Sequence, residues 1–255
     1  MRILFVSDEV NPFSQSSSTA TIVRHLPEQL HNEGGYEMRI MMPRYGIVSE
    51  RRNRLHEVIR LSGTRIQMGN RTETLKVKVA SIPGIRLQVY FMDNDYYFKR
   101  KGIYQTVQND QLFEDNLERA LFFGRASLET IRKLGWAPDI IHAFGWMSGF
   151  VPMLLQTEYA GDDIFGDTQS VFTPHPVSFD AAICEAFAEA EGLTDTLPLS
   201  GKDLNHVGNM FADATISLPQ IEEKAASALS FADTPGEQFE MARSVYEQLL
   251  SKVAA

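Results

Sequence analysis

Short apolar runs alternate with amphipathic segments at the start of the chain. Residues 3–7 (I-L-F-V-S) form a continuous apolar run, as in strands buried on both faces of a parallel sheet. Apolar residues then recur at helical spacing between Ile22 and Leu30, and a Gly-Gly pair at 34–35 ends that segment. Residues 36–43 form a second strand-like run. The pattern predicts a β-α-β unit.

A strand-rich section without helices follows between residues 55 and 92. Alternating or apolar runs predict strands at residues 58–59, 75–79 and 85–91. Residues 65–71 and 82–84 are typical of hairpin turns or loop joints.

The remaining chain again alternates between helical and strand patterns. Helices are predicted at residues 112–134, 146–155, 180–189, 203–211, from about 219, and at 239–253. Strands are predicted at residues 139–143, 170–173 and 214–217. This alternation predicts a single doubly wound, Rossmann-like α/β domain with a mostly parallel sheet.

The charge distribution restricts the kinds of ligand. A formal net charge of -9 argues against nucleic acid and anionic membrane surfaces as partners. Between residues 135 and 201 there is no Lys or Arg, so a diphosphate site built there would depend on backbone amides.

Cys184 is the only cysteine; we interpret it as buried and inert within a helix. A single cysteine fits a reducing compartment, so we expect a cytoplasmic protein.

Two histidines follow or end predicted strands. His142 ends the apolar run at 139–143, at the carboxyl edge where α/β proteins bind ligands; a purely structural role is the alternative. His175 lies between two prolines, and a site role and a loop-packing role both stay open. Both residues fit one crevice, but no third ligand has the spacing for a metal, so we expect no metal site.

Other candidate ligand-binding residues lie in loops and at predicted helix starts. The run Gln15, Ser16, Ser17 and Ser18 opens the first helix, where amides and hydroxyls suit an anion or a sugar hydroxyl; helix capping is the alternative. Glu9 follows the first strand, Asn94 and Tyr96 belong to an expected cleft loop, and Trp146 starts a helix, where packing is its alternative role.

Several segments together resemble one enzyme family. The opening M-R-I-L-F-V-S-D-E-V-N-P-F is similar to the start of the bacterial glycogen and starch synthases. W-A-P-D-I-I-H-A-F-G-W-M-S-G-F-V-P resembles their P-D-I-I-H-x-H-D-W-H-T-G-L-V-P, and V-F-T-P-H-P resembles V-F-T-I-H-N. Residues 91–104, 113–126 and 211–219 match further family segments in the same order.

The resemblance implies a fold and a place in a larger architecture. The family enzymes are two-domain GT-B glycosyltransferases, whose first domain holds much of the glucan acceptor surface and whose second domain holds most nucleotide-sugar contacts. This chain resembles the N-terminal domain only, in a short form that we associate with Bacteroidetes. We expect residues 1–255 to form that one domain, with 235–253 as the terminal helix that braces it.

The chain departs from the family where the chemistry is done. The family motif K-T-G-G-L-A-D-V corresponds to a stretch with Gln15 at the Lys, Ser17 and Ser18 at the glycines, and Thr21 at the Asp. In the H-D-W-H motif, Phe144, Gly145 and Met147 replace the first His, the Asp and the second His. A thioether neither donates a hydrogen bond nor carries charge.

These losses predict a synthase-like domain that is non-catalytic alone, without catalytic residues or a cofactor. We expect its cleft face to bind a glucan or a protein partner, and self-association is the simplest way to cover that face. One alternative is an ADP-glucose-dependent α-glucan glucosyltransferase completed by a partner chain or an oligomer. Another is a Rossmann-like domain that binds a different small molecule.

Overall fold

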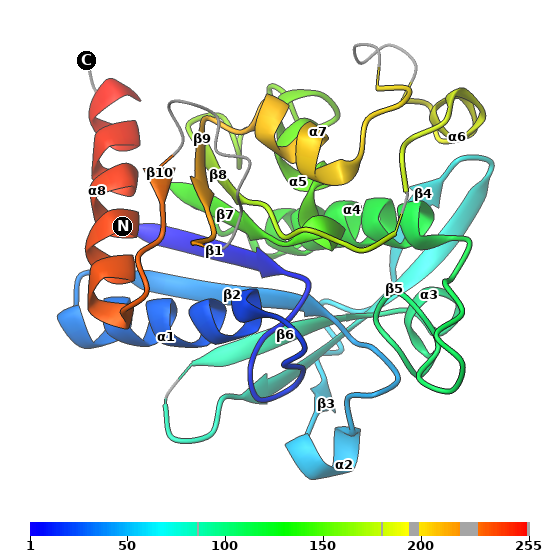
Figure 1. Cartoon of the computed structure of the whole chain (residues 1–255), viewed down its shortest axis with the longest axis horizontal. Coiled ribbons are helices and arrows are strands. Elements are labelled where there is room, and N and C mark those ends of the chain that lie inside the picture. The colour runs from blue at the N-terminus through cyan, green and yellow to red at the C-terminus, as the bar shows by residue number, and fades with distance from the viewer. Residues whose placement is uncertain (86, 180, 194–198, 220–228, 254–255) are drawn as a thin grey trace.

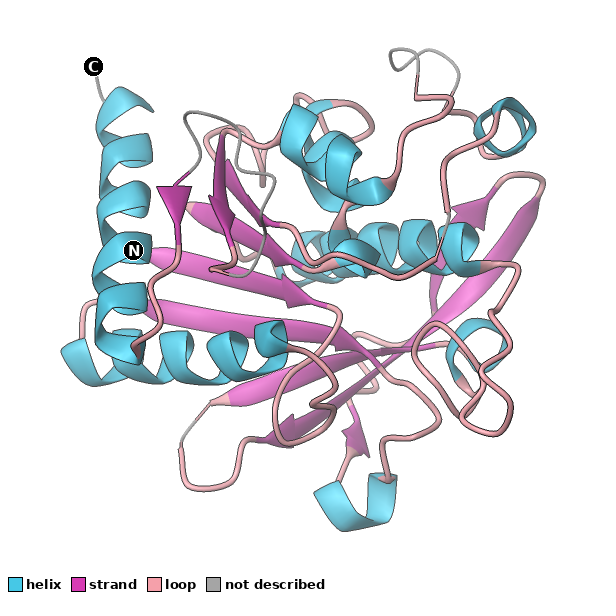
Figure 2. Cartoon of the chain, viewed as in Figure 1, coloured by secondary structure: helices cyan, strands magenta, loops and turns pink. Residues whose placement is uncertain are grey.

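A twisted sheet with helices on both sides forms the molecule (Figures 1 and 2). The computed structural model describes residues 1–85, 87–179, 181–193, 199–219 and 229–253. The strands are β1 (Arg2–Ser7), β2 (Glu37–Pro43), β3 (His56–Glu57), β4 (Thr64–Met68), β5 (Arg71–Ser81), β6 (Gln88–Asp93), β7 (Ile140–Phe144), β8 (Gln169–Thr173), β9 (Ala214–Ser217) and β10 (Leu229–Ser230). The helices are α1 (Ser18–Glu33), α2 (Glu50–Asn53), α3 (Asp95–Phe98), α4 (Asn116–Leu134), the 3-10 turn η1 (Trp146–Ser148), α5 (Phe150–Gln156), α6 (Glu185–Ala190), α7 (Leu204–Phe211) and α8 (Pro235–Val253).

The sheet has the strand order β10-β9-β8-β7-β1-β2-β6-β5-β3, with β4 paired to β5. All neighbours from β10 to β6 are parallel, whereas β5 is antiparallel to β6, and both β3 and β4 are antiparallel to β5. The chain builds outward from β1 in one direction and later from β7 in the other. This confirms the doubly wound, mostly parallel fold and places a topological switch point between β1 and β7.

The two directions of winding place helices on opposite faces. Right-handed crossovers put α1 on one face, and they put α5 on the other because β7 and β8 progress in the opposite direction. Contacts group α1 with α8, and α4 with α5 and η1 (Figure 1). Since helices cover both faces, β1 and β7 are buried almost throughout, which explains why both are mostly apolar.

The terminal helix α8 packs against α1 and β9. Its Tyr246 hydroxyl lies 2.6 Å from Nδ1 of His142, and both side chains are fully buried. Thr173 Oγ1 lies 2.9 Å from the other ring nitrogen. His142 therefore links the sheet to the last helix.

Several predicted boundaries were wrong in the strand-rich section. The strand expected at 58–59 lies at β3 instead, and residues 58–62 form turns. The joint expected at 65–71 is mostly strand β4, with a turn at Gly69 and Asn70. Two-residue turns between antiparallel strands favour a positive φ at their first central residue, and Gly69 supplies it with φ 53°.

Helix starts were also placed too early. The helix expected from 112 begins at Asn116, because Leu112 pairs with Gln105 in an isolated β-bridge. The helix expected at 180–189 is α6, and Cys184 precedes it as an exposed residue rather than a buried helical one. The helix expected at 146–155 is divided into η1 and α5. Most of the helix expected from 219 lies outside the described residues.

Candidate functional site

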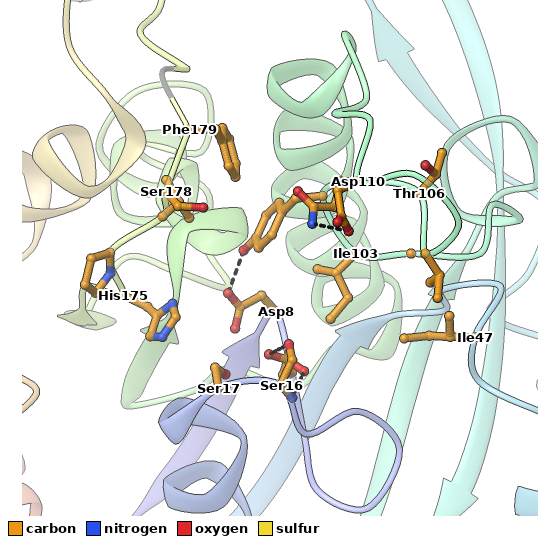
Figure 3. A pocket seen from close by; sticks show the side chains of 17 residues that line it. Asp8, Ser16, Ser17, Ile47, Ile103, Thr106, Asp110, His175, Ser178 and Phe179 are labelled. Carbon is orange, nitrogen blue, oxygen red and sulfur yellow. Dashed lines mark hydrogen bonds between the residues drawn. The ribbon is translucent and has the colours of Figure 1, made fainter.

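A pocket of about 440 Å³ lies over the carboxyl end of β1, beside the switch point (Figure 3). Four segments form its walls: the loop after β1, the loop between β2 and α2 with Ile47, the loop between α3 and α4, and the loop after β8. Ser16 and Ser17 add the start of α1. Open α/β sheets bind ligands at this position, so the fold itself makes the pocket the leading candidate site.

Asp8 is a strongly perturbed titratable group in the pocket wall. Its side chain is 1% exposed, and burial, with a smaller contribution from Glu9, raises its pKa from 3.8 to about 8. Its Oδ2 accepts a 2.8 Å hydrogen bond from the Tyr104 hydroxyl, drawn as a dashed line in Figure 3. Burial also raises the pKa of Tyr104 well above its ordinary value, so this hydroxyl keeps its proton and acts as the donor.

Gly145 makes room for the Asp8 carboxyl group. Its φ is 82°, a conformation that favours glycine, and an added Cβ would overlap the Asp8 carboxylate. The aspartate of the H-D-W-H motif therefore does not fit at this position while Asp8 keeps its observed place. Glycine at position 145 therefore leaves the space that the Asp8 side chain occupies.

Glu9 organises the entry to α1. Its Oε2 accepts a 2.8 Å hydrogen bond from the Ser16 amide, and its Oε1 accepts a 2.7 Å bond from the Ser16 hydroxyl. Ser17 occupies the N-cap position, but its hydroxyl pairs with the Thr19 hydroxyl rather than with a helix amide. A free amide of Ser16 is thus not available to an anion, because a carboxylate already holds it.

His175 lines the pocket from the loop after β8. Burial lowers the pKa of its imidazole, so the ring is neutral at neutral pH. The backbone of His175 is held by Asn205 of α7, which accepts from the His175 amide at 3.2 Å and donates to its carbonyl at 2.9 Å. This two-point contact fixes the segment independently of the flanking prolines.

The other sequence-predicted residues lie outside the pocket wall. Burial lowers the pKa of His142 well below its ordinary value, and both of its ring nitrogens have internal partners. Asn94 caps α3 by accepting from the Tyr96 and Tyr97 amides. The Tyr96 ring is about half exposed and receives a contact from Arg71.

Trp146 supports the pocket from behind. It is fully buried, and its ring packs edge-on against Tyr104 at 5.7 Å and against Phe179 at 5.4 Å. Both of those rings line the pocket. Gln15 and Ser18 are exposed and do not contribute to the wall.

Among the pocket residues that sequence reasoning missed are Asp8, Tyr104, Asp110 and Phe179. Asp8 follows directly after the first apolar strand, and that position was its only signal. Tyr104 belongs to the stretch that the family resemblance places over the cleft. Asp110 and Phe179 have no signal in the sequence, because their loops have no periodic pattern.

Carboxyl groups, of which Asp8 keeps its proton at neutral pH, are the main acidic groups of the pocket. Asp8, Glu9 and Asp110 line it, and no Lys or Arg occurs among its described lining residues. In the described part of the chain, no three His, Cys, Asp or Glu side chains are grouped to hold a metal ion. The described helices include none with the length and apolarity to cross a bilayer.

Comparisons with known proteins agree on one family. The model of the starch synthase catalytic domain matches residues 2–217. A glycogen synthase of Chlorobium limicola is 43% identical over 176 residues, which cover 69% of this chain and 36% of that protein. A glycogen synthase of Chlorobaculum parvum is 37% identical over 233 residues, which cover 89% of this chain and 47% of the relative.

A solved structure shares the fold. The catalytic domain of starch synthase IV from Arabidopsis thaliana, bound to ADP and acarbose, superimposes with a TM-score of 0.67 at 17% identity, covering 96% of this chain and 50% of that one. The chain thus spans less than half the length of the two glycogen synthases and half of the solved chain. On its sequence and fold together, this chain belongs to the starch synthase catalytic domain family.

Proposed function

We propose that this domain binds a glucan or related saccharide in the pocket and does not by itself catalyse glucosyl transfer. The observation that carries the proposal is the lining of the pocket, which holds Asp8, Glu9 and Asp110 and no described cationic side chain, although Asp8 keeps its proton at neutral pH. Transfer from a nucleotide sugar needs cations or aimed donors where the diphosphate charge develops. Carboxylates at that place oppose the same charge.

The residues at the family's catalytic positions support the same reading. Gln15, at the position of the motif lysine, is exposed and outside the pocket wall. Met147, at the position of the second motif histidine, is fully buried in the core. Gly145 is covered by the Asp8 carboxyl group. None of the three presents a donor to a ligand in the pocket.

The pocket retains features that suit sugars. Hydroxyls of Ser16, Ser17 and Ser178 and the ring of Phe179 all line it. Hydroxyls exchange hydrogen bonds with sugar hydroxyls, and an aromatic face packs on the apolar side of a sugar ring. The Arabidopsis relative was solved with acarbose, a finding about that protein that makes saccharides the first ligands to test here.

Two measurements on the purified chain test the proposal. Calorimetry with ADP-glucose, ADP and maltooligosaccharides should show binding of the sugars without binding of ADP. A transfer assay from ADP-glucose to glycogen should show no turnover, with the Chlorobium limicola glycogen synthase as the positive control. Robust turnover by the chain alone would refute the non-catalytic part.

A second candidate is a glucosyltransferase completed by another chain or by an oligomer. The observation that favours it is His175, which keeps its place in the pocket at the end of the V-F-T-P-H segment. In that case His175→Ala would reduce any turnover of the completed assembly. Failure to bind both nucleotide and sugar would instead favour a protein partner on this face, including a second copy.

The cytoplasmic location stays a proposal and rests on the single cysteine.

A further inference from the structure

The buried carboxyl group of Asp8 has an unusual hydrogen-bond deficit. Its Oδ1 has no hydrogen-bond partner, although the residue is 1% exposed and lines the pocket. The amides of Asp8 and Glu9 lie near it, but they donate to the Phe144 carbonyl and to Ser7 Oγ. Buried polar atoms are nearly always paired, and the exceptions concentrate where a ligand or a reaction supplies the partner.

The groups around Asp8 define the chemistry that suits it. Glu9 lies beside it on the same strand end, Tyr104 donates to its other oxygen, and the buried Tyr45 lies close enough to interact with it electrostatically. Neither tyrosine carries charge at neutral pH, since burial raises the pKa of both. The pocket near Asp8 is thus acidic, and no described lining residue is positively charged.

A positively charged donor fits this surrounding better than a neutral hydroxyl. An ammonium group has three donors and no acceptor, so it can donate to Oδ1 once the Asp8 carboxyl group has released its proton, and it can face Glu9 at the same time. The rings of Tyr104 and Phe179 lie in the same wall, and aromatic faces attract cations. A metal ion is a poorer fit, because the described residues hold no group of three suitable ligands.

We propose that the pocket binds the protonated amine of an amino sugar, with Asp8 as its direct partner and Glu9 as the second carboxylate. The proposal rests on the proposed saccharide binding and names the chemical class of the sugar. The amine would donate to Asp8 Oδ1, while Tyr104 keeps its hydrogen bond to Oδ2.

Binding should be linked to a proton. Because the pKa of Asp8 is about 8, the free protein holds this proton at neutral pH. An ammonium group beside the carboxylate favours its ionised form, so the complex releases a proton to solvent. A neutral sugar at the same place leaves Asp8 protonated and releases none.

Calorimetry with matched monosaccharides tests the inference. The ligands are glucose, N-acetylglucosamine, glucosamine and 6-amino-6-deoxyglucose, and each of the last three differs from glucose in one substituent. We expect at least one amino sugar to bind about tenfold more tightly than glucose. At about pH 6.5, in two buffers of different ionisation enthalpy, its binding should release close to one proton.

Two variants distinguish the effect of the Asp8 carboxyl group from that of losing any one carboxyl group. Asp8→Asn should abolish the preference for the amine and the proton release. Asp163→Asn removes one carboxylate at an exposed position away from the pocket and should leave both unchanged. The proton release of the unmodified protein stays a valid test even if Asp8→Asn fails to fold.

The outcomes distinguish this inference from the proposed function. Equal binding of amino sugars and glucose would overturn the inference and leave saccharide binding intact. Amine preference without proton release, or its persistence in Asp8→Asn, would also overturn it. Binding of none of these sugars or the maltooligosaccharides would overturn both proposals.

Discussion

Replacing Asp8 by asparagine should stabilise the fold at neutral and higher pH. Burial raises the pKa of Asp8 from 3.8 to about 8, so between these values the folded protein keeps a proton that the unfolded chain has lost. The free energy of unfolding therefore falls as the pH rises through this window and levels off above it. Asparagine does not ionise, and its oxygen can still accept from the Tyr104 hydroxyl.

The magnitude follows from the two pKa values. Their difference corresponds to a loss of stability on the order of 5 kcal/mol, at about 1.4 kcal/mol for each pH unit. The buried amide of asparagine brings two donors without assigned partners, which costs about 1–3 kcal/mol. We expect Asp8→Asn to be about 2–4 kcal/mol more stable at about pH 8, and equal or less stable at about pH 5.

Urea unfolding followed by circular dichroism, from about pH 5 to about pH 9, measures this difference. The stability of the original protein minus that of Asp8→Asn should fall by about 1.4 kcal/mol per pH unit up to about pH 8. Asp163→Asn serves as the control, because its carboxyl group is exposed. A difference between the original protein and Asp8→Asn that stays constant with pH would refute the claim that folded Asp8 holds its proton.

Three further substitutions probe the surroundings of the pocket. Tyr246→Phe removes the partner of His142 Nδ1 and should lower the free energy of unfolding by about 1–3 kcal/mol; unchanged thermal unfolding would contradict the linking role of this pair. Gly145→Ala introduces a Cβ into the Asp8 carboxyl group at a φ of 82° and should cost at least about 2 kcal/mol; a neutral effect on the unfolding midpoint would show that Asp8 moves aside freely. Arg119→Met removes the buried guanidinium that donates to the Tyr97 and Ile103 carbonyls and to the Asn116 amide oxygen. It should lower the free energy of unfolding by about 3 kcal/mol and weaken sugar binding. Unchanged sugar affinity in calorimetry would show that this loop does not contribute to binding.

The sequence predicted the sheet well because its strands have a local signature. Strands buried on both faces are mostly apolar, and the runs Ile3–Val6 in β1 and Ile140–Phe144 in β7, interrupted by His142, show this directly. The amphipathic helices α1 and α4 carry a comparable signal in their apolar spacing. Boundaries were predicted less well, because Leu112 fits the helical spacing yet pairs with Gln105 in a β-bridge.

The site required information that no local pattern contains. His142 and Asp8 both end or follow an apolar strand, and the sequence alone singled out the histidine. In the structure His142 lies within β7 and is turned to Tyr246 and Thr173, whereas Asp8 lies past the end of β1 in the pocket wall. The direction of each side chain depends on neighbours that are distant in sequence.

The sequence by itself therefore determined the fold class, the family resemblance and the scarcity of cations in the second half of the chain, since apolar periodicity, motif order and residue charge are local properties. Only the tertiary structure decided that Asp8, rather than His142, faces the pocket. The reason is steric and electrostatic: Gly145 leaves space for the carboxyl group, Tyr104 binds one of its oxygens, and burial keeps its proton in place.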